Sequence, residues 1–218
     1  MKDLFDAIKA GDAAKVTELL DQDAALANAD ENGQKAIFTA MYYGKPEIAR
    51  LLESRGADLD VFAAAMLGRV DKLEALLAGN PSLASQLSHD GWTALHLASF
   101  FDAEPAVRLL LNKGGPVNAR STNPMRNMPI HAAASRRSAA CVKLLIEHGA
   151  QVNAQQHGGW APLHAAAQNG DLTTAAMLVE AGADVNMRAE NNQRPLDLAM
   201  TKGHQDMVEY LESKGASL

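Results

Sequence analysis

Four segments of this sequence share one short pattern at a spacing close to 33 residues. Their last positions are 35, 33 and 33 residues apart, and the segments are Thr93 to His96, Met128 to His131, Ala161 to His164 and Arg194 to Asp197. Alanines follow each copy, and a second apolar segment then runs to a glycine. A unit of this length cannot bury its apolar face alone, so repeated units stack and form a continuous core. The repeat therefore restricts the chain to a stacked, one-dimensional architecture.

Weaker copies of the unit extend the repeat to the start of the sequence. Phe5, Phe38 and Phe62 occupy the position that histidine holds later. Eighteen residues beyond this position, every unit has Gly, Asn or Asp: Asp23, Gly56, Asn80, Gly114, Gly149, Gly182 and Gly215. These residue types tolerate the left-handed backbone that ends many helices, so we predict that conformation at all seven positions. Because Ala and Leu dominate the units, both segments of each are predicted to be helical.

The pattern Thr-Pro-Leu-His-x-Ala, the period near 33 and the ending Gly-Ala-Asp-Val-Asn resemble the ankyrin repeat family. The segment from Gly182 to Asn186 carries the whole ending. The resemblance implies an all-α fold, an α-solenoid of stacked helix-turn-helix repeats with short β-hairpin fingers. It covers essentially the whole chain. We expect a single domain over residues 1–218, with seven units at about 1–32, 33–58, 59–89, 90–122, 123–156, 157–190 and 191–218.

Two intervals depart from the period. Phe38 and Phe62 are only 24 residues apart, so the finger between these units is predicted to be missing. The gap is either a notch for a partner or a neutral deletion in a tolerant loop. The finger at residues 120–127 is two residues longer than its counterpart and carries Arg120 and Arg126. This chain looks similar to bacterial proteins of the family that have the same gap, so a bacterial source is expected.

Composition argues against several classes of function. The chain has 26 acidic and 20 basic residues and a formal net charge of -6, which disfavours broad capture of nucleic acid or of an acidic membrane. No apolar run approaches the roughly 18 residues of a membrane span, and the N-terminus lacks a signal core, so a cytoplasmic location is expected. Cys141, the single cysteine, lies in an apolar run and is expected to be an inert core thiol.

The histidines of the repeat are the first candidates for chemistry. Equivalent residues of stacked units are separated by about 8–10 Å. Zinc needs ligands at about 2 Å, so His96, His131 and His164 cannot share one ion. The family resemblance implies that this histidine bonds backbone groups and ties the finger to the helix. The sequence shows no triad, phosphate loop or metal-ligand spacing, so we expect no catalytic residue, no metal, no cofactor and no enzymatic activity.

The resemblance implies that binding uses the fingertips and the exposed, concave side of the first helices. Counting along the repeats predicts the contact residues Tyr42, Tyr43, Met66, Leu67, Trp92, Phe100, Phe101, Arg126, Arg136, Arg137, Trp160, Gln168 and Asn169. Six of these are among only ten aromatic residues in the chain, and aromatic residues are common binding hot spots.

These residues predict a groove for a partner protein or peptide with aromatic or aliphatic anchors and an acidic group at one end. The partner is expected to be neither nucleic acid nor membrane, and the chain is expected to be a monomer. Three alternatives stay open. In the first, some of the side chains pack into the groove floor. In the second, the exposed aromatic residues form the interface of a homo-oligomeric scaffold. In the third, which is less favoured, the protein binds a small ligand or is an enzyme.

Overall fold

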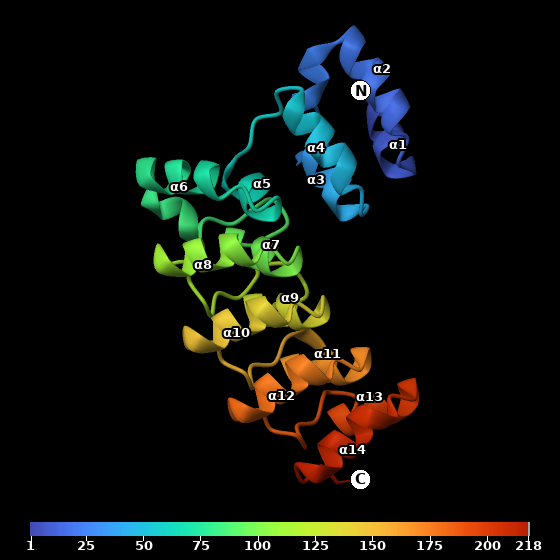
Figure 1. Ribbon diagram of the computed structural model, residues 1–218, viewed down its shortest axis with the longest axis vertical. Coiled ribbons are helices and arrows are strands. Elements are labelled where there is room, and N and C mark those ends of the chain that lie inside the picture. Colours follow the sequence, from blue (N-terminus) through green and yellow to red (C-terminus); the bar gives the residue numbers. More distant parts are fainter. Residues whose placement is uncertain (218) are drawn as a thin grey trace. The chain divides into compact units, whose positions relative to one another are not determined.

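A computed structural model of the chain describes residues 1–217, and this part is almost entirely helical (Figure 1). The α-helices of residues 1–217 form seven consecutive pairs. The pairs are α1 (Lys2–Ala10) with α2 (Ala13–Gln22), α3 (Ala36–Tyr42) with α4 (Pro46–Ser54), α5 (Val61–Met66) with α6 (Val70–Gly79), α7 (Ala94–Phe100) with α8 (Glu104–Asn112), α9 (Pro129–Ser135) with α10 (Ala139–Glu147), α11 (Pro162–Asn169) with α12 (Leu172–Glu180), and α13 (Pro195–Lys202) with α14 (Gln205–Ser213). The prediction of an all-α solenoid is confirmed.

The chain divides into two compact units, Met1–Ala64 and a second unit that starts at Ala65. The first unit contains the helix pairs α1/α2 and α3/α4, and the boundary falls within α5. In a stack of repeats each repeat contacts only its neighbours, so compact sub-units also arise within one array. A single domain over residues 1–218 stays a prediction.

The first unit holds one true β-hairpin finger, made of β1 (Asp30–Glu31) and β2 (Gln34–Lys35). The strands pair Asp30 with Lys35 and Glu31 with Gln34. The two loop residues Asn32 and Gly33 have φ angles of 57° and 84°, the left-handed values that a two-residue type I′ turn requires. The Asn-Gly sequence therefore fixes the register of this finger.

No finger precedes α5, as the short interval predicts. Residues 55–60 join α4 to α5 without a strand. Asp60 caps the start of α5, because its Oδ1 accepts hydrogen bonds from the backbone N–H groups of Phe62 (3.1 Å) and Ala63 (2.9 Å). Its other oxygen pairs with the Lys35 ammonium at 3.0 Å. The side chain thus satisfies N–H groups that would otherwise be left without partners at the helix N-terminus.

The second unit stacks its helices in two rows. Figure 1 shows α7, α9, α11 and α13 following one another in one row, with α8, α10, α12 and α14 in the other. Buried alanines such as Ala133 and Ala166 keep the first row thin. Pro129, Pro162 and Pro195 start three of these helices, as predicted, because a missing N–H costs nothing in the first turn.

Backbone hydrogen bonds join the fingers of the second unit into one row. The N–H of Thr122 donates to the Gly91 carbonyl at 3.0 Å, and the N–H of His157 donates to the Met125 carbonyl at 2.8 Å. The N–H of Glu190 donates to the Gly158 carbonyl at 3.0 Å. Each finger is therefore held by its neighbour as well as by its own helix pair.

The prediction of left-handed residues at all seven helix ends is wrong at two of them. Gly56, Gly114, Gly149, Gly182 and Gly215 have φ angles between 80° and 90°. Asp23 and Asn80 are instead extended, with φ angles of -147° and -149°. Their side chains cap the 3₁₀-helices η1 (Ala24–Asn28) and η2 (Pro81–Ser85) by accepting from Ala25 N–H and Ser82 N–H. Asp and Asn have this option because their side chains bond nearby backbone groups, which glycine cannot do.

Candidate functional site

Three aromatic side chains of the second unit pack edge to face and form what we call the aromatic cluster: Trp92, Phe100 and Phe101. Trp92 lies on a finger, Phe100 is the last residue of α7, and Phe101 follows it. The ring centroids of Trp92 and Phe100 are 5.3 Å apart, and those of Phe100 and Phe101 are 5.1 Å apart. All three side chains are half-buried, so the cluster presents part of its apolar surface to solvent.

Arg136, the residue after α9, extends the cluster into the next repeat. Its guanidinium carbon lies 4.9 Å from the centroid of the Phe100 ring, within the range of a cation–π interaction. The side chain is otherwise exposed. A positive charge therefore lies directly beside the aromatic surface, although the chain as a whole is acidic.

Trp92 is held by packing. Its ring stacks on His96 with centroids 5.8 Å apart. The indole Nε1 is buried and has no hydrogen-bond partner in the described structure. A buried N–H without a partner costs about 1–3 kcal/mol. Ring contacts with His96 and Phe100 offset this cost and fix the indole at the base of the cluster.

The repeat histidines join each first helix to the structure that follows. In all three, Nδ1 accepts from the backbone N–H three residues earlier, at 3.2 Å for His96, 3.2 Å for His131 and 3.1 Å for His164. The proton is therefore on Nε2, which donates to the carbonyls of Asn127 (3.1 Å), Ala154 (2.9 Å) and Gln193 (3.3 Å), respectively. His96 and His164 bond a carbonyl of the next unit, and His131 bonds Ala154 at the end of its own unit. No ring leaves a nitrogen for a metal.

The histidines are neutral in the folded chain. Burial lowers the pKa of His96 to about 4, and although its bond to the Asn127 carbonyl acts in the other direction, burial is the larger effect. Burial likewise lowers the pKa of His131 to about 4 and also lowers that of His164. Their hydrogen-bond pattern agrees, because a protonated ring has no Nδ1 lone pair to accept with.

In the last repeat, Asp197 takes the place of this histidine. One carboxylate oxygen accepts from the backbone N–H of Arg194 at 2.8 Å and from its Nε at 3.2 Å. Burial acts to raise the pKa of Asp197, but the hydrogen bonds from Arg194 outweigh it and lower the pKa. The Arg194 side chain also donates to the Ser217 carbonyl, so an Arg–Asp pair makes the link that a histidine makes elsewhere.

Residues 1–217 contain no group of three or more His, Cys, Asp or Glu side chains arranged to hold an ion. We predict that EDTA or a zinc-specific chelator leaves the melting temperature unchanged, because both nitrogens of each repeat histidine are already bonded to backbone groups. Thermal melts followed by circular dichroism test this. A chelator-induced fall of several degrees would contradict the structural role of the histidines.

Cys141 is buried in α10, and its sulfur lies 3.8 Å from Oδ1 of Asp102. Burial, with the negative charge of Asp102 as the next contribution, raises the pKa of the thiol to about 12. Since only the thiolate is nucleophilic, we predict that iodoacetamide at pH 8 modifies the folded chain at least about a hundredfold more slowly than the urea-unfolded chain. Mass spectrometry of timed samples measures this ratio, and equal rates would show that the thiol is accessible.

The structure places the predicted contact residues at different depths. Tyr43 (53% exposed), Arg126, Arg136 and Arg137 are exposed. The half-buried residues are Tyr42, Leu67, Trp92, Phe100, Phe101, Trp160, Gln168 and Asn169.

The structure contradicts the predicted contact role of Met66, because its side chain is only 2% exposed and offers no contact surface. Every residue of α5 from Val61 to Met66 is buried. Counting positions along the repeat overestimates exposure in this six-residue helix, where the apolar side chains all gain from burial.

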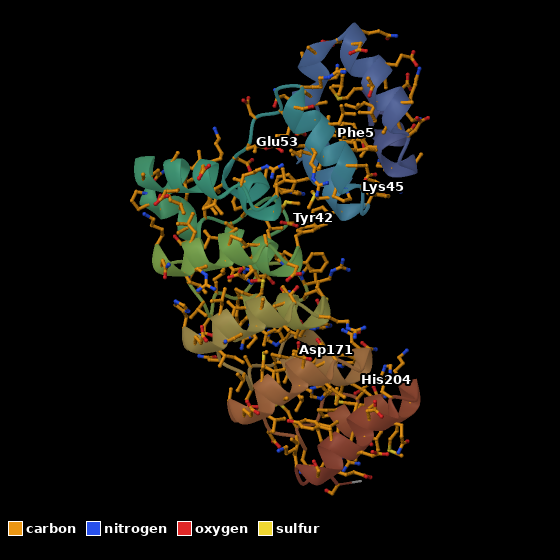
Figure 2. The ribbon with its side chains drawn as sticks, viewed as in Figure 1. Phe5, Tyr42, Lys45, Glu53, Asp171 and His204 are labelled. Atoms are coloured by element: carbon orange, nitrogen blue, oxygen red, sulfur yellow. The ribbon has the colours of Figure 1, made fainter. Side chains whose placement is uncertain are left out.

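Only some of the predicted residues come together. Trp160 contacts its own His164 (centroids 5.8 Å apart), and Nδ2 of Asn169 donates to the Ser135 carbonyl at 3.2 Å. Tyr42, labelled in Figure 2 at the end of α3, contacts Phe38 (centroids 6.5 Å apart) within the first unit. A single groove that runs from Tyr42 and Tyr43 to the aromatic cluster stays a prediction.

Two polar residues that the sequence reasoning did not select hold the turns before α12 and α14. Asp171 is 7% exposed, and its Oδ1 accepts from the Thr174 N–H at 3.2 Å. Nε2 of His204 bonds the Gln168 carbonyl at 3.0 Å and so links the last repeat to α11 (Asp171 and His204 are labelled in Figure 2). The position of Asp171 directly after Gly170 is the signal that would have identified it as a helix cap, whereas His204 occupies the N-cap position of α14 without a side-chain cap bond.

Known proteins match most of this chain. A family model described as "Ankyrin repeats (3 copies)" matches residues 61–156, 115–189 and 154–218. The chain is 38% identical to a probable E3 ubiquitin-protein ligase of Oryza sativa subsp. japonica, over 45% of this chain and 22% of that protein. It is 33% identical to the B-cell lymphoma 3 protein homolog of Mus musculus, over 60% of this chain and 24% of that protein.

A longer match covers 72% of this chain, at 32% identity, and 15% of the Ankyrin repeat and SAM domain-containing protein 6 of Rattus norvegicus. The chain spans less than a quarter of the length of each of these three relatives. The helices of residues 1–217 include none with the length and apolar character of a membrane span.

Proposed function

The chain belongs to the ankyrin-repeat family, and we propose that it binds a partner polypeptide through the aromatic cluster of its second unit. Ankyrin repeats are generally protein–protein interaction modules. The observation that carries the proposal is the edge-to-face packing of Trp92, Phe100 and Phe101 at half-exposed positions, with Arg136 over the Phe100 ring. Aromatic and arginine side chains dominate binding hot spots, and rings held by one another lose little entropy when a partner covers them.

The arrangement of the cluster favours a polypeptide over a small ligand. Its residues come from a finger, the end of α7 and the turn after α9, so the surface extends across two repeats. A small-molecule site encloses most of its ligand and converges a few polar groups on it. Here the donors of the repeat histidines point to backbone carbonyls and are already bonded. We propose no catalytic role, no nucleic-acid or membrane partner, and a cytoplasmic location.

A random dodecapeptide library displayed on phage tests the proposal when it is selected on the immobilised full chain. We predict that selected peptides bind the double variant Phe100→Ser/Phe101→Ser about a hundredfold more weakly, since two hot-spot side chains together contribute about 3 kcal/mol and each tenfold change in affinity is about 1.4 kcal/mol. Met200→Ser is the matched control, because Met200 is an exposed apolar residue (49%) on α13, away from the cluster. Fluorescence polarisation measures the affinities.

Two results would contradict the proposal. One is recovery of peptides whose affinity is the same for the double variant and for Met200→Ser. The other is a monomer–dimer equilibrium in light scattering that the double variant abolishes, which would assign the cluster to self-association and support the scaffold alternative. Circular dichroism of all variants shows whether the helices remain formed.

A further inference from the structure

One stretch of the second unit is positively charged, although the chain as a whole is acidic. Residues 105–146 contain seven arginines and lysines and no aspartate or glutamate, in a chain with 26 acidic and 20 basic residues. The rest of the chain therefore holds 13 basic and 26 acidic side chains. The stretch includes the longer finger, α9 and Arg136, and it meets the aromatic cluster where Arg136 lies over the Phe100 ring.

Four of the seven cations have partners within the chain. Arg108 pairs with Glu104 (2.6 Å), Lys113 with Glu74 (3.2 Å) and Lys143 with Glu147 (3.9 Å). Arg120 donates to the backbone carbonyls of Arg126 (3.4 Å) and Gln155 (2.9 Å).

The other three are exposed and have no carboxylate at ion-pair distance within residues 1–217: Arg126, Arg136 and Arg137. We call these the three free arginines. The guanidinium of Arg136 lies over the Phe100 ring. None of the three charges is neutralised by a carboxylate of the described residues.

Two of the three free arginines occupy backbone conformations that suit glycine. Arg126 and Arg137 have φ angles of 48° and 61°. The position of Arg137 is filled in five other repeats by glycine with the same left-handed backbone: Gly11, Gly44, Gly68, Gly170 and Gly203. Side chains other than Gly, Asn and Asp pay a steric cost there. Strained residues of this kind persist where something else favours the side chain, and function is one such reason.

We infer that the partner segment is acidic, with carboxylates that pair with the three free arginines while an aromatic or aliphatic side chain contacts the aromatic cluster. The inference rests on the proposed function and specifies its partner. Charge complementarity supports it, because a positive surface without internal counter-ions attracts carboxylates and repels other cations. Nucleic acid would also meet cations and aromatic rings, but it would face the excess of acidic side chains on the rest of the chain.

Arg137→Gly separates binding from stability. The change restores the residue of five other repeats, so the chain keeps or gains thermal stability while it loses one cation. Arg136→Gln removes the charge and the cation–π contact with Phe100 and keeps a polar side chain. Arg108→Ala is the matched control, because it removes a cation of the same stretch whose charge is already paired with Glu104.

The test uses library peptides that depend on the aromatic cluster, labelled with fluorescein. We expect them to be rich in Asp and Glu, and copies with Asn and Gln in those places to bind about tenfold more weakly. Arg136→Gln and Arg137→Gly should each weaken binding about threefold or more, and Arg108→Ala less than twofold. Raising NaCl from 0.05 to 0.5 M should weaken the acidic peptides and leave the amide copies unaffected.

Three outcomes would overturn the inference. If the amide copies bind as well as the acidic peptides, the partner is not acidic, although the proposed function stands. If oligothymidylate of twelve nucleotides displaces the peptides at lower concentration than the acidic peptides themselves, the surface is one for single-stranded nucleic acid. If no selected peptide depends on the aromatic cluster, the proposed function fails and the inference fails with it.

Discussion

Lowering the pH from 6.5 to 4 is expected to destabilise the folded chain by several kcal/mol, through the repeat histidines. His96 and His131 have pKa values near 4 when folded, against 6.5 for an unperturbed histidine. Between these values the unfolded chain binds more protons than the folded chain, so the free energy of unfolding falls as the pH falls. Stability is full above pH 6.5, and the loss is complete below pH 4. Each of the two histidines contributes roughly 3 kcal/mol to this loss.

The slope of stability against pH identifies the groups responsible. Urea unfolding at half-unit steps of pH gives the free energy of unfolding, and each repeat histidine contributes up to about 1.4 kcal/mol per pH unit. His131→Gln removes one of the two histidines with a pKa near 4, so its slope between pH 6 and 5 should be between about one third and one half smaller, whatever its absolute stability. His157→Gln is the control, because the side chain of His157 is exposed. A slope unchanged by His131→Gln would mean that carboxylates, not the buried histidines, cause the acid sensitivity.

The fold was predictable from the sequence because the repeat encodes local geometry. Prolines at the start of first helices, alanines where helices approach and glycines at helix ends each act through their own backbone or size, whatever the partner. The prediction of a left-handed backbone was wrong at Asp23 and Asn80, and the reason is again local. Asp and Asn tolerate a left-handed backbone, but they also cap a following turn with their side chains, and the residue type alone does not decide between the two.

The binding surface was only partly predictable, because exposure depends on packing between repeats. Counting positions selected both Phe100 and Arg136, which are in contact, but it treated the buried Met66 as equivalent to them. Residue spacing also did not show that Arg136 lies over the Phe100 ring of the preceding repeat. Nor did it show that the Arg120 side chain donates to finger carbonyls, whereas that of Arg126 does not. These distinctions come from contacts between side chains of different repeats, which a periodic sequence pattern does not specify.

Gly159→Ala is expected to cost about 2–5 kcal/mol and to separate two adjacent fingers. A Cβ at Gly159 would lie 2.7 Å from the backbone nitrogen of Glu190 and 3.1 Å from the Ala189 carbonyl carbon. The same Glu190 N–H donates to the Gly158 carbonyl at 3.0 Å, so the clash falls on one of the bonds that join the fingers. The left-handed φ of 75° adds about 1–2 kcal/mol of strain, and the overlap adds about 1–3 kcal/mol.

Gly158→Ala isolates the effect of the close approach. Gly158 has nearly the same φ, 79°, but a Cβ there would meet only the edge of the Trp160 ring at 3.7 Å. This variant should therefore lose only the roughly 1–2 kcal/mol of backbone strain. Urea unfolding of both proteins gives the difference, and hydrogen exchange at the Glu190 amide shows whether the junction has opened in Gly159→Ala alone. Equal losses in the two variants, with the Glu190 amide still protected in both, would show that the fingers do not depend on this contact.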